Sequence, residues 1–374
     1  MNILINCSNL KAGGGIQVAD SVCGLLNEFH NHFFIVVLSS KMECTKSRIE
    51  GYTNVKEVYT YDVKNNLQTL VFGRDSFLDG CVKIHSIDAV LTIFGPSRWN
   101  PKVAHLSGWA IPHPLLPDSP YFTMLPPAER LLVKLKCLLW RYMFGRSTDF
   151  FWTENPFTTD RVKSLFPKKT VFSVTNYYNQ VFDTPYKWTH AISLPSFDGT
   201  TLLTITANYP HKNLKLLVES AELLRENHPD FNFRFVLTVD EGDLVIPEVV
   251  KNNFVLIGKV DVVECPNLYQ QSDIMILPSL LECFSATYPE AMKMGVPIVT
   301  TDLDFAKGLC GNAACYYSAV NAEDAAVAIY KVATNKEYAK QLVDNGKKQL
   351  LTYDNYEQRV DKLIGILEKI VGEK

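Results

Sequence analysis

The sequence lacks the features that mark a secreted, membrane-spanning or disulfide-bonded protein. Its N-terminus has no basic segment followed by a long apolar run, and no apolar stretch is long enough to cross a bilayer. The nine cysteines include no Cys-x-x-Cys pair, which is typical of reduced thiols in the cytosol. We expect a cytoplasmic protein, and leave open that it lies on the inner face of the cell membrane.

An excess of one charge and a dinucleotide-binding motif are also missing. The net charge of −3 and the pI of 6.3 give no reason to expect a nucleic-acid partner. Gly13–Gly15 follows the first expected strand, but Gln17 and Val18 break the Gly-x-Gly-x-x-Gly pattern. The second expected strand ends in Leu38-Ser39-Ser40, without an acid for a ribose hydroxyl. These absences argue against a nicotinamide-dependent enzyme.

Strand-like and helix-like segments alternate along the 374 residues, which predicts an α/β protein with two doubly wound parallel sheets. Residues 179–200 show no periodicity and contain Pro185, Pro195 and Gly199, so we place the linker there. We expect domains at 1–188 and 189–352 and a final helix over 353–374. A single long helix is expected over 65–84.

Residues 273–301 are the most informative stretch. The apolar run 274–277 stops at Pro278 and predicts a buried strand, and a polar turn with Glu282 follows. Pro289 indicates a helix that starts between residues 285 and 288, with Glu290 in its first turn. Ligands bind at the carboxyl edge of such sheets, and carboxylates there suit sugar or ribose hydroxyls. Alternatively, Glu290 complements the helix dipole and Glu282 is solvated.

This stretch resembles the Glu-x7-Glu signature of family 4 glycosyltransferases, which have the GT-B architecture of two Rossmann-like domains facing across a cleft. Glu282 and Glu290 have the spacing of that signature, and Gly295-Val296-Pro297 also matches it. The resemblance implies that Glu282 addresses the donor sugar and Glu290 the ribose, with Ser285 and Ala286 at the phosphate-facing helix start. The usual Glu-Gly-Phe-Gly loop is Glu282-Cys-Phe-Ser285 here, so two glycines are missing.

Part of a second motif of that family, Gly-Arg-x-x-x-Lys-Asn, is present. Lys212-Asn213 are present, but Ala207-Asn208 replace the glycine and the arginine, and His211 is a candidate replacement for the lost phosphate contact. A lysine at a helix start opposes the helix dipole, so Lys212 is informative if an anion binds there. The resemblance also places Asn208 and Gly258 beside the nucleotide. Asp302-Leu-Asp304 has the form of a metal motif, but the family has a metal-free acidic turn there.

The first half offers weaker candidates. The glycine triplet puts bare N–H groups at a helix start, and in the resembling family such a loop faces the donor diphosphate, which makes Gly14 and Gly15 candidates. A tight turn explains the glycines equally well. His105 and His113 follow a strand and are the histidines that we consider for contact with donor or acceptor, although a structural role suits either.

Residues 127–146 predict an amphipathic helix. Leu131, Leu135, Leu138, Leu139 and Tyr142 share one face. Arg130, Lys134 and Arg141 run along another. Such a helix can lie on an anionic membrane, and the alternative is a helix whose apolar face packs on the sheet.

The resemblance implies a retaining glycosyltransferase, without a metal or other cofactor, that moves a sugar from a nucleotide-diphosphate sugar to a glycan or lipid-linked acceptor. Bacterial surface-polysaccharide synthesis is the expected setting. Lys212, Glu282, His105 and His113 are the candidate catalytic residues. Two alternatives stay open, because the loop glycines and the arginine are missing: a noncatalytic nucleotide-sugar-binding subunit, and an epimerase or hydrolase with the same architecture.

Overall fold

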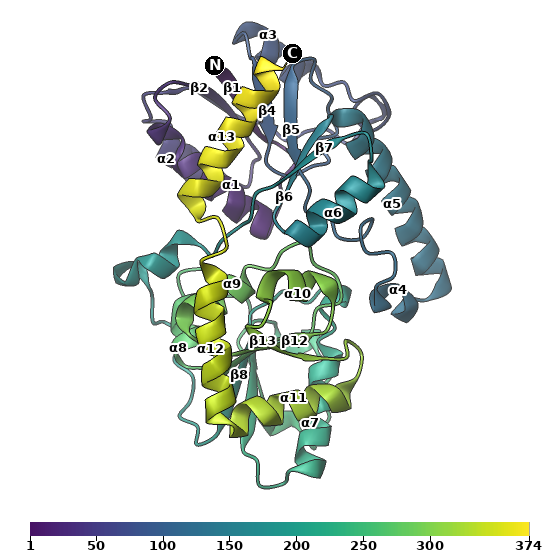
Figure 1. The fold of residues 1–374 in the computed structure, drawn as a ribbon, viewed down its shortest axis with the longest axis vertical. Coiled ribbons are helices and arrows are strands. Elements are labelled where there is room, and N and C mark those ends of the chain that lie inside the picture. Colours follow the sequence, from purple (N-terminus) through teal and green to yellow (C-terminus); the bar gives the residue numbers. More distant parts are fainter. Residues whose placement is uncertain (374) are drawn as a thin grey trace. The chain divides into compact units, whose positions relative to one another are not determined.

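A computed structural model describes residues 1–373, which form two compact units (Figure 1). The first unit comprises residues 1–117, 127–177 and 354–374, and the second comprises residues 118–126 and 178–353. The chain therefore enters the second unit briefly over residues 118–126, passes to it again after Tyr177 and returns to the first unit at Asp354. Each unit has its own parallel sheet and its own hydrophobic core.

The first unit contains a seven-stranded parallel sheet in the order β3-β2-β1-β4-β5-β6-β7. Its strands are β1 (Asn2–Cys7), β2 (Phe33–Leu38), β3 (Val55–Thr60), β4 (Ala89–Thr92), β5 (Ala104–Gly108), β6 (Phe150–Thr153) and β7 (Thr170–Ser173). Its helices are α1 (Gly14–Gly24), α2 (Glu43–Ile49), α3 (Ser76–Ile84), α5 (Pro127–Ser147), α6 (Pro156–Leu165) and α13 (Tyr356–Gly372). The central strands are apolar on both faces because helices cover both sides of the sheet.

The second unit contains a six-stranded parallel sheet in the order β10-β9-β8-β11-β12-β13. Its strands are β8 (Thr200–Thr204), β9 (Phe233–Leu237), β10 (Phe254–Leu256), β11 (Ile274–Leu277), β12 (Ile298–Thr301) and β13 (Ala314–Tyr317). Its helices are α4 (Pro120–Met124), α7 (Lys215–Asn227), α8 (Cys265–Gln270), α9 (Thr287–Met294), α10 (Asp304–Cys310), α11 (Ala322–Thr334) and α12 (Lys336–Leu350). The two-sheet α/β organisation predicted from the sequence is confirmed.

The last helix, α13, packs on the first sheet, where it contacts α1, β4 and β5. Its apolar residues, which lie at helical spacing, are buried in the first core: Val360, Leu363, Ile364, Leu367 and Ile370. Asn355 begins the helix by accepting a hydrogen bond from the backbone N–H of Gln358, whose side chain bonds back to Asn355. The chain's C-terminal segment thus completes the core of the N-terminal unit.

The single helix expected over 65–84 is wrong. The segment holds a short π-helical turn, Gln68–Phe72, and the separate helix α3. Gly73 ends the turn with φ +64°, and Asp75 starts α3 by accepting hydrogen bonds from the backbone N–H groups of Phe77 and Leu78. A glycine in the left-handed region followed by an aspartate cap is a stop and a start signal, and the apolar spacing alone concealed it.

Candidate functional site

The carboxyl edge of the second sheet collects most of the residues that the sequence singled out. Lys212 follows β8, Gly258 follows β10, and Glu282 follows β11, while Glu290 lies in α9. Strands β10, β9, β8 and β11 are parallel neighbours, so their carboxyl ends meet at one edge. This is the edge at which parallel α/β sheets bind ligands.

The unit around α9 forms as its sequence predicts. All four residues of β11 are buried, and α9 begins at Thr287 inside the expected range. Gly295 ends the helix with φ +71°, a conformation that a side chain rarely adopts, and the chain enters β12 three residues later. Ser285 and Ala286 stand immediately before the helix, and the Ser285 hydroxyl lies 2.9 Å from the Thr287 hydroxyl.

Lys212 and Glu282 form an ion pair that is largely shielded from solvent. The lysine Nζ contacts Glu282 Oε1, and the two side chains are 14% and 10% exposed. Their loops are joined by the backbone as well, because the Leu280 N–H donates to the His211 carbonyl over 2.8 Å. The anion that pairs with Lys212 is therefore the carboxylate of Glu282, a residue of the chain itself. Lys212 ends a short 3-10 turn, Pro210–Lys212, and the helix α7 starts only at Lys215.

His211 stands beside the ion pair without a charge of its own. Burial, followed by the positive charge of Lys212, lowers the pKa of its imidazole to about 4. Its ring stacks on Tyr209 and meets Tyr121 edge-on. Near neutral pH this histidine offers an N–H or a lone pair but no positive charge, so it does not replace the charge of the missing arginine.

Glu290 is a buried carboxylate with a tyrosine partner. It is 5% exposed, and its Oε2 accepts a hydrogen bond of 3.1 Å from the Tyr269 hydroxyl. Burial raises the pKa of Glu290 to about 7, and the tyrosine bond opposes that rise. A glutamate that only complements the helix dipole can do so while exposed to solvent. The helix dipole therefore does not explain why Glu290 is buried. A buried carboxylate with spare acceptor capacity suits hydroxyl donors of a ligand.

Two weaker candidates lie on the same edge. The Asn208 amide donates to the Asp243 carbonyl over 2.8 Å and its residue is exposed. Gly258 has φ +70°, and a Cβ there would meet the Asp240 carboxylate at 3.0 Å. The turn therefore requires glycine at position 258 for backbone reasons, whatever else it binds.

The first-unit candidates fall on two different edges of its sheet. Gly14 and Gly15 open α1 directly after the turn at Gly13, and His113 lies in the loop beyond the carboxyl end of β5. His105 lies near the amino end of β5 and is 3% exposed. Its ring nitrogens lie 2.8 Å from the Ser147 carbonyl and 2.8 Å from the Thr92 hydroxyl. These contacts are those of a structural histidine.

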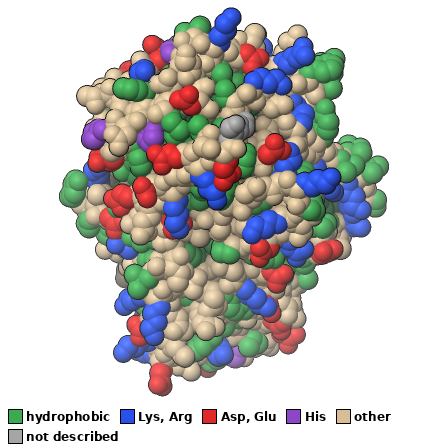
Figure 2. Space-filling model, turned by 45° about the horizontal axis from the view of Figure 1, so that its top comes forward, with side chains coloured by type: hydrophobic (Ala, Val, Ile, Leu, Met, Phe, Trp, Pro, Cys, Tyr) green, Lys and Arg blue, Asp and Glu red, His purple; other side chains and the backbone are tan. Residues whose placement is uncertain are grey.

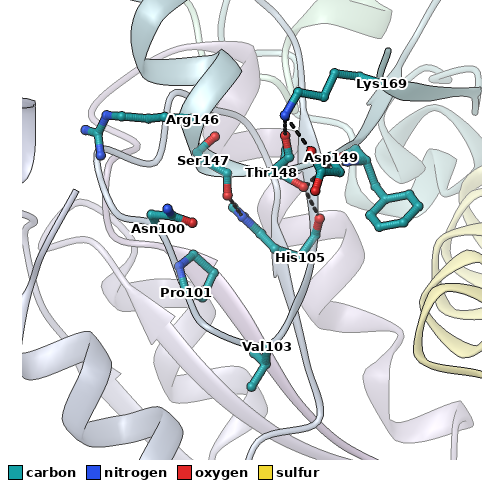
Figure 3. A pocket seen from close by; sticks show the side chains of 10 residues that line it. Asn100, Pro101, Val103, His105, Arg146, Ser147, Thr148, Asp149 and Lys169 are labelled. Atoms are coloured by element: carbon teal, nitrogen blue, oxygen red, sulfur yellow. Dashed lines mark hydrogen bonds and ion pairs between the residues drawn. The ribbon is translucent and has the colours of Figure 1, made fainter. Parts of the chain in front are cut away.

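A pocket of about 200 Å³ opens at this amino edge (Figure 3). Figure 3 shows the His105 ring directed at Ser147, while Lys169 reaches the Thr148 carbonyl at 2.9 Å and the Asp149 carboxylate at 2.5 Å. The dashed lines join His105, Ser147, Thr148, Asp149 and Lys169, whereas Arg146 donates to the Thr69 carbonyl outside the view. This pocket contains none of the residues at the carboxyl edge of the second sheet, so it is separate from the site predicted there.

Two residues that contact the site were not predicted from the sequence. Tyr269 reaches Glu290 from α8, and Ser119 starts α4 and donates from its hydroxyl to the Leu280 carbonyl over 2.7 Å. Ser119-Pro120 is a recognisable helix start, but no local pattern links it to a loop 161 residues away. Long-range contacts of this kind emerge only from the fold.

No disulfide joins any two of the nine cysteines, all of which lie within residues 1–373. Within residues 1–373 no group of three or more histidine, cysteine, aspartate or glutamate side chains is arranged to hold a metal ion. No helix in the same range combines the length and apolar character needed to cross a bilayer.

Comparison with known proteins shows a family resemblance over the second half of the chain. Residues 190–349 match the model described as glycosyl transferases, group 1. Over residues 190–349 the chain is therefore similar to the group 1 glycosyl transferases. Mannosylfructose-phosphate synthase of Agrobacterium fabrum is 26% identical over 117 residues, and the match covers 28% of this chain and about a quarter (26%) of that relative's length. The region that matches the family model contains Lys212, Glu282 and Glu290.

Solved structures of similar fold cover almost the whole chain. Sucrose-phosphate synthase of Thermosynechococcus elongatus superposes with a TM-score of 0.70 at 14% identity, covering 100% of this chain and 99% of the other. An Anabaena protein in complex with UDP and glucose gives 0.63 at 12% identity, covering 98% and 99%. The predicted GT-B fold is thereby confirmed. At these identities the likeness concerns the fold alone.

Proposed function

We propose that this chain is a retaining glycosyltransferase that moves a sugar from a nucleotide-diphosphate sugar to a hydroxyl of a glycan or lipid-linked acceptor in bacterial surface-polysaccharide synthesis. The observation that carries the proposal is the shielded Lys212–Glu282 pair at the same sheet edge as buried Glu290, inside the region that matches the family. The Anabaena neighbour with bound UDP and glucose supports a nucleotide-sugar donor. UDP and glucose are ligands of that neighbour.

The roles follow from charge and burial. The leaving diphosphate gains negative charge in the transition state, so a positioned cation accelerates the step. Lys212 supplies that charge, and the N–H groups at the start of α9, near Ser285 and Ala286, add positive potential. Glu282 then orients sugar hydroxyls while it holds Lys212, and Glu290 accepts from ribose hydroxyls. We propose that these groups act without a metal ion.

A noncatalytic nucleotide-sugar-binding subunit is the second candidate. Lys212 is already neutralised by Glu282, and His211 is uncharged near neutral pH, so the positive charge available to a leaving diphosphate is small. Such a site binds a donor without assisting its departure. The two candidates differ in turnover and not in binding.

The deciding experiment combines binding and turnover on purified protein. Thermal shifts with UDP, GDP, ADP, TDP and their common sugars identify the donor, because a ligand of the folded state raises the melting temperature. Turnover of that donor is then followed with and without a glycan acceptor. Conversion only with acceptor supports transfer. Conversion without acceptor indicates an epimerase or hydrolase, and binding without any conversion indicates the noncatalytic subunit.

Lys212→Met tests the assigned role of the lysine. We expect transfer to slow by on the order of 100-fold or more, because one electrostatic contact to the transition state is lost. Lys251→Met is the control, since this exposed lysine precedes β10, at the amino edge of the same sheet, and lies outside the Lys212–Glu282 pair. An unchanged rate in Lys212→Met, with the variant still folded, would refute the role.

A further inference from the structure

The helix α5 displays its apolar face to solvent. Six large side chains of this helix are between 43% and 60% exposed: Leu131, Leu132, Leu135, Leu138, Leu139 and Tyr142. Among the helix residues, only Met143, Phe144 and Ser147 are buried. The interpretation in which the leucine face packs on the sheet is therefore wrong. At 3.6 residues per turn the six exposed side chains fall within an arc of about 120°, so they form one strip along the helix.

A second segment continues this strip. Residues 64–74 approach the C-terminal end of α5, where the Tyr142 hydroxyl donates to the Val71 carbonyl over 2.9 Å and Arg146 donates to the Thr69 carbonyl over 2.6 Å. Beside these bonds, Leu67 and Phe72 are 67% and 62% exposed. The apolar surface thus spans two elements of the first unit that are fixed to each other by hydrogen bonds.

Gly73 keeps the two elements together. A Cβ at this position would lie 1.7 Å from Arg146 Nη1, and the residue has φ +64°. No side chain fits there unless Arg146 moves and releases the segment. The close contact between residues 64–74 and α5 therefore depends on glycine at position 73 and arginine at position 146.

The charges around the apolar surface are almost all positive. Residues 64–74 and α5 together contain seven basic residues and one acid, Glu129, in a chain of net charge −3. On the helix, Lys134 and Arg141 flank the strip on one side and Lys136 on the other. At the right-hand edge of Figure 2, the side on which Figure 1 draws α5, hydrophobic and basic side chains lie next to one another.

We propose that α5 and residues 64–74 form a docking surface for an anionic lipid bilayer. The leucines and Phe72 enter the boundary between headgroups and acyl chains, and the flanking lysines and arginines contact lipid phosphates. A second copy of the chain fits less well, because a two-fold interface brings the same basic flanks face to face. A lipid-linked acceptor at this membrane rests on the proposed function, whereas docking itself requires no substrate.

The test is flotation of the full chain with vesicles of phosphatidylcholine alone and of phosphatidylcholine with 30% phosphatidylglycerol. We expect binding to the anionic vesicles that weakens with added salt. Each basic residue near an anionic surface is worth about a fivefold factor, so Lys134→Ala/Arg141→Ala should weaken binding about 25-fold. Leu131→Ser/Leu135→Ser/Leu138→Ser should weaken it on the order of 100-fold, through lost apolar burial.

A matched control removes exposed apolar side chains elsewhere. Val245 and Leu351, in the second unit, are 90% and 86% exposed, and Val245→Ser/Leu351→Ser should bind vesicles like the wild type. Circular dichroism and thermal melting check that every variant is folded. Equal loss in the control variant, or no flotation of the wild type at low salt, would overturn the proposal.

Two further readouts distinguish lipid docking from self-association and from a role in catalysis. A dimer in sedimentation that the leucine variant abolishes, without vesicle binding by the wild type, would assign the surface to a second copy and refute lipid docking. Sugar transfer to a water-soluble acceptor should be unchanged in the leucine and charge variants. Flotation without any sugar transfer would refute the proposed function and leave the docking surface standing. Sugar transfer without flotation would refute the docking surface and leave the proposed function standing.

Discussion

The carboxylate of Glu290 makes the stability of the unliganded protein depend on pH in a way that glutamine at this position should remove. Glu290 is 5% exposed, and burial raises the pKa of its carboxyl from 4.5 to about 7. The folded chain therefore holds this proton more tightly than the unfolded chain does. The stability penalty is small below about pH 4.5, grows between about pH 4.5 and pH 7, and is complete above that range.

The size of the effect follows from the two pKa values. At 1.36 kcal/mol for each tenfold change in proton affinity, the difference between 4.5 and about 7 corresponds to ~3 kcal/mol of free energy of unfolding. Glutamine is neutral at every pH and is free of this penalty. A buried amide N–H without a partner costs about 1–2 kcal/mol at every pH, so the pH dependence is more informative than the absolute value.

The measurement is urea unfolding of the wild type and Glu290→Gln without ligand at about pH 4.5, 6.5 and 8.5. Relative to the wild type, we expect the variant to gain ~3 kcal/mol between the lowest and the highest pH. Glu226→Gln, on the exposed part of α7, is the control and should show no such trend. In the same variant the affinity for the nucleotide should fall by about 10- to 100-fold, since a hydrogen bond to a charged acceptor is replaced by a weaker one.

Parallel stability curves for the wild type and Glu290→Gln would refute the reasoning, because they would mean that the carboxylate is solvated in the folded chain. Unchanged nucleotide affinity together with the predicted stability trend would leave the burial argument intact and remove the ribose from the role of Glu290. Stabilisation and lost binding in one variant are the combination that a functional buried carboxylate predicts.

Two further substitutions test the first unit. Gly13→Ala should destabilise the first unit by about 1–3 kcal/mol in urea unfolding, because Gly13 has φ +72°, which alanine rarely adopts. Gly14→Ala is the control, because Gly14 lies at a helical position with open space, and it should be neutral or stabilising by up to about 1 kcal/mol. Equal losses of stability in the two variants would contradict the backbone argument. Arg359→Met should destabilise the protein increasingly above pH 7, by about 1.4 kcal/mol for each pH unit, because the buried Glu154 carboxyl, whose pKa burial raises to about 7, loses its cation and must keep its proton. At about pH 5, where Glu154 is protonated, the loss should shrink, and a pH-independent loss would indicate packing alone.

The first unit also shows where sequence reasoning stops. Arg359 lies far along the chain from Glu154 and Asn176, yet it donates to Asn176 and its charge opposes the rise in the pKa of Glu154. Arg359 occupies a position of α13 that the helical pattern marks only as polar. No pattern within one segment predicts that two segments 183 residues apart share a buried charge network, because such contacts depend on how the helices pack on the sheet.

The sequence by itself determined the alternation of strands and helices, the parallel sheets and the β11–α9 unit that carries Glu282 and Glu290. These features arise from local causes, namely apolar periodicity, proline at a helix start and glycine at its end. Only the tertiary structure decided that Glu282 neutralises Lys212, that Tyr269 holds Glu290, and that the leucines of α5 face solvent. Those outcomes depend on burial and on contacts between distant segments, and hydrophobic spacing is the same whether an apolar face meets a protein core or a membrane.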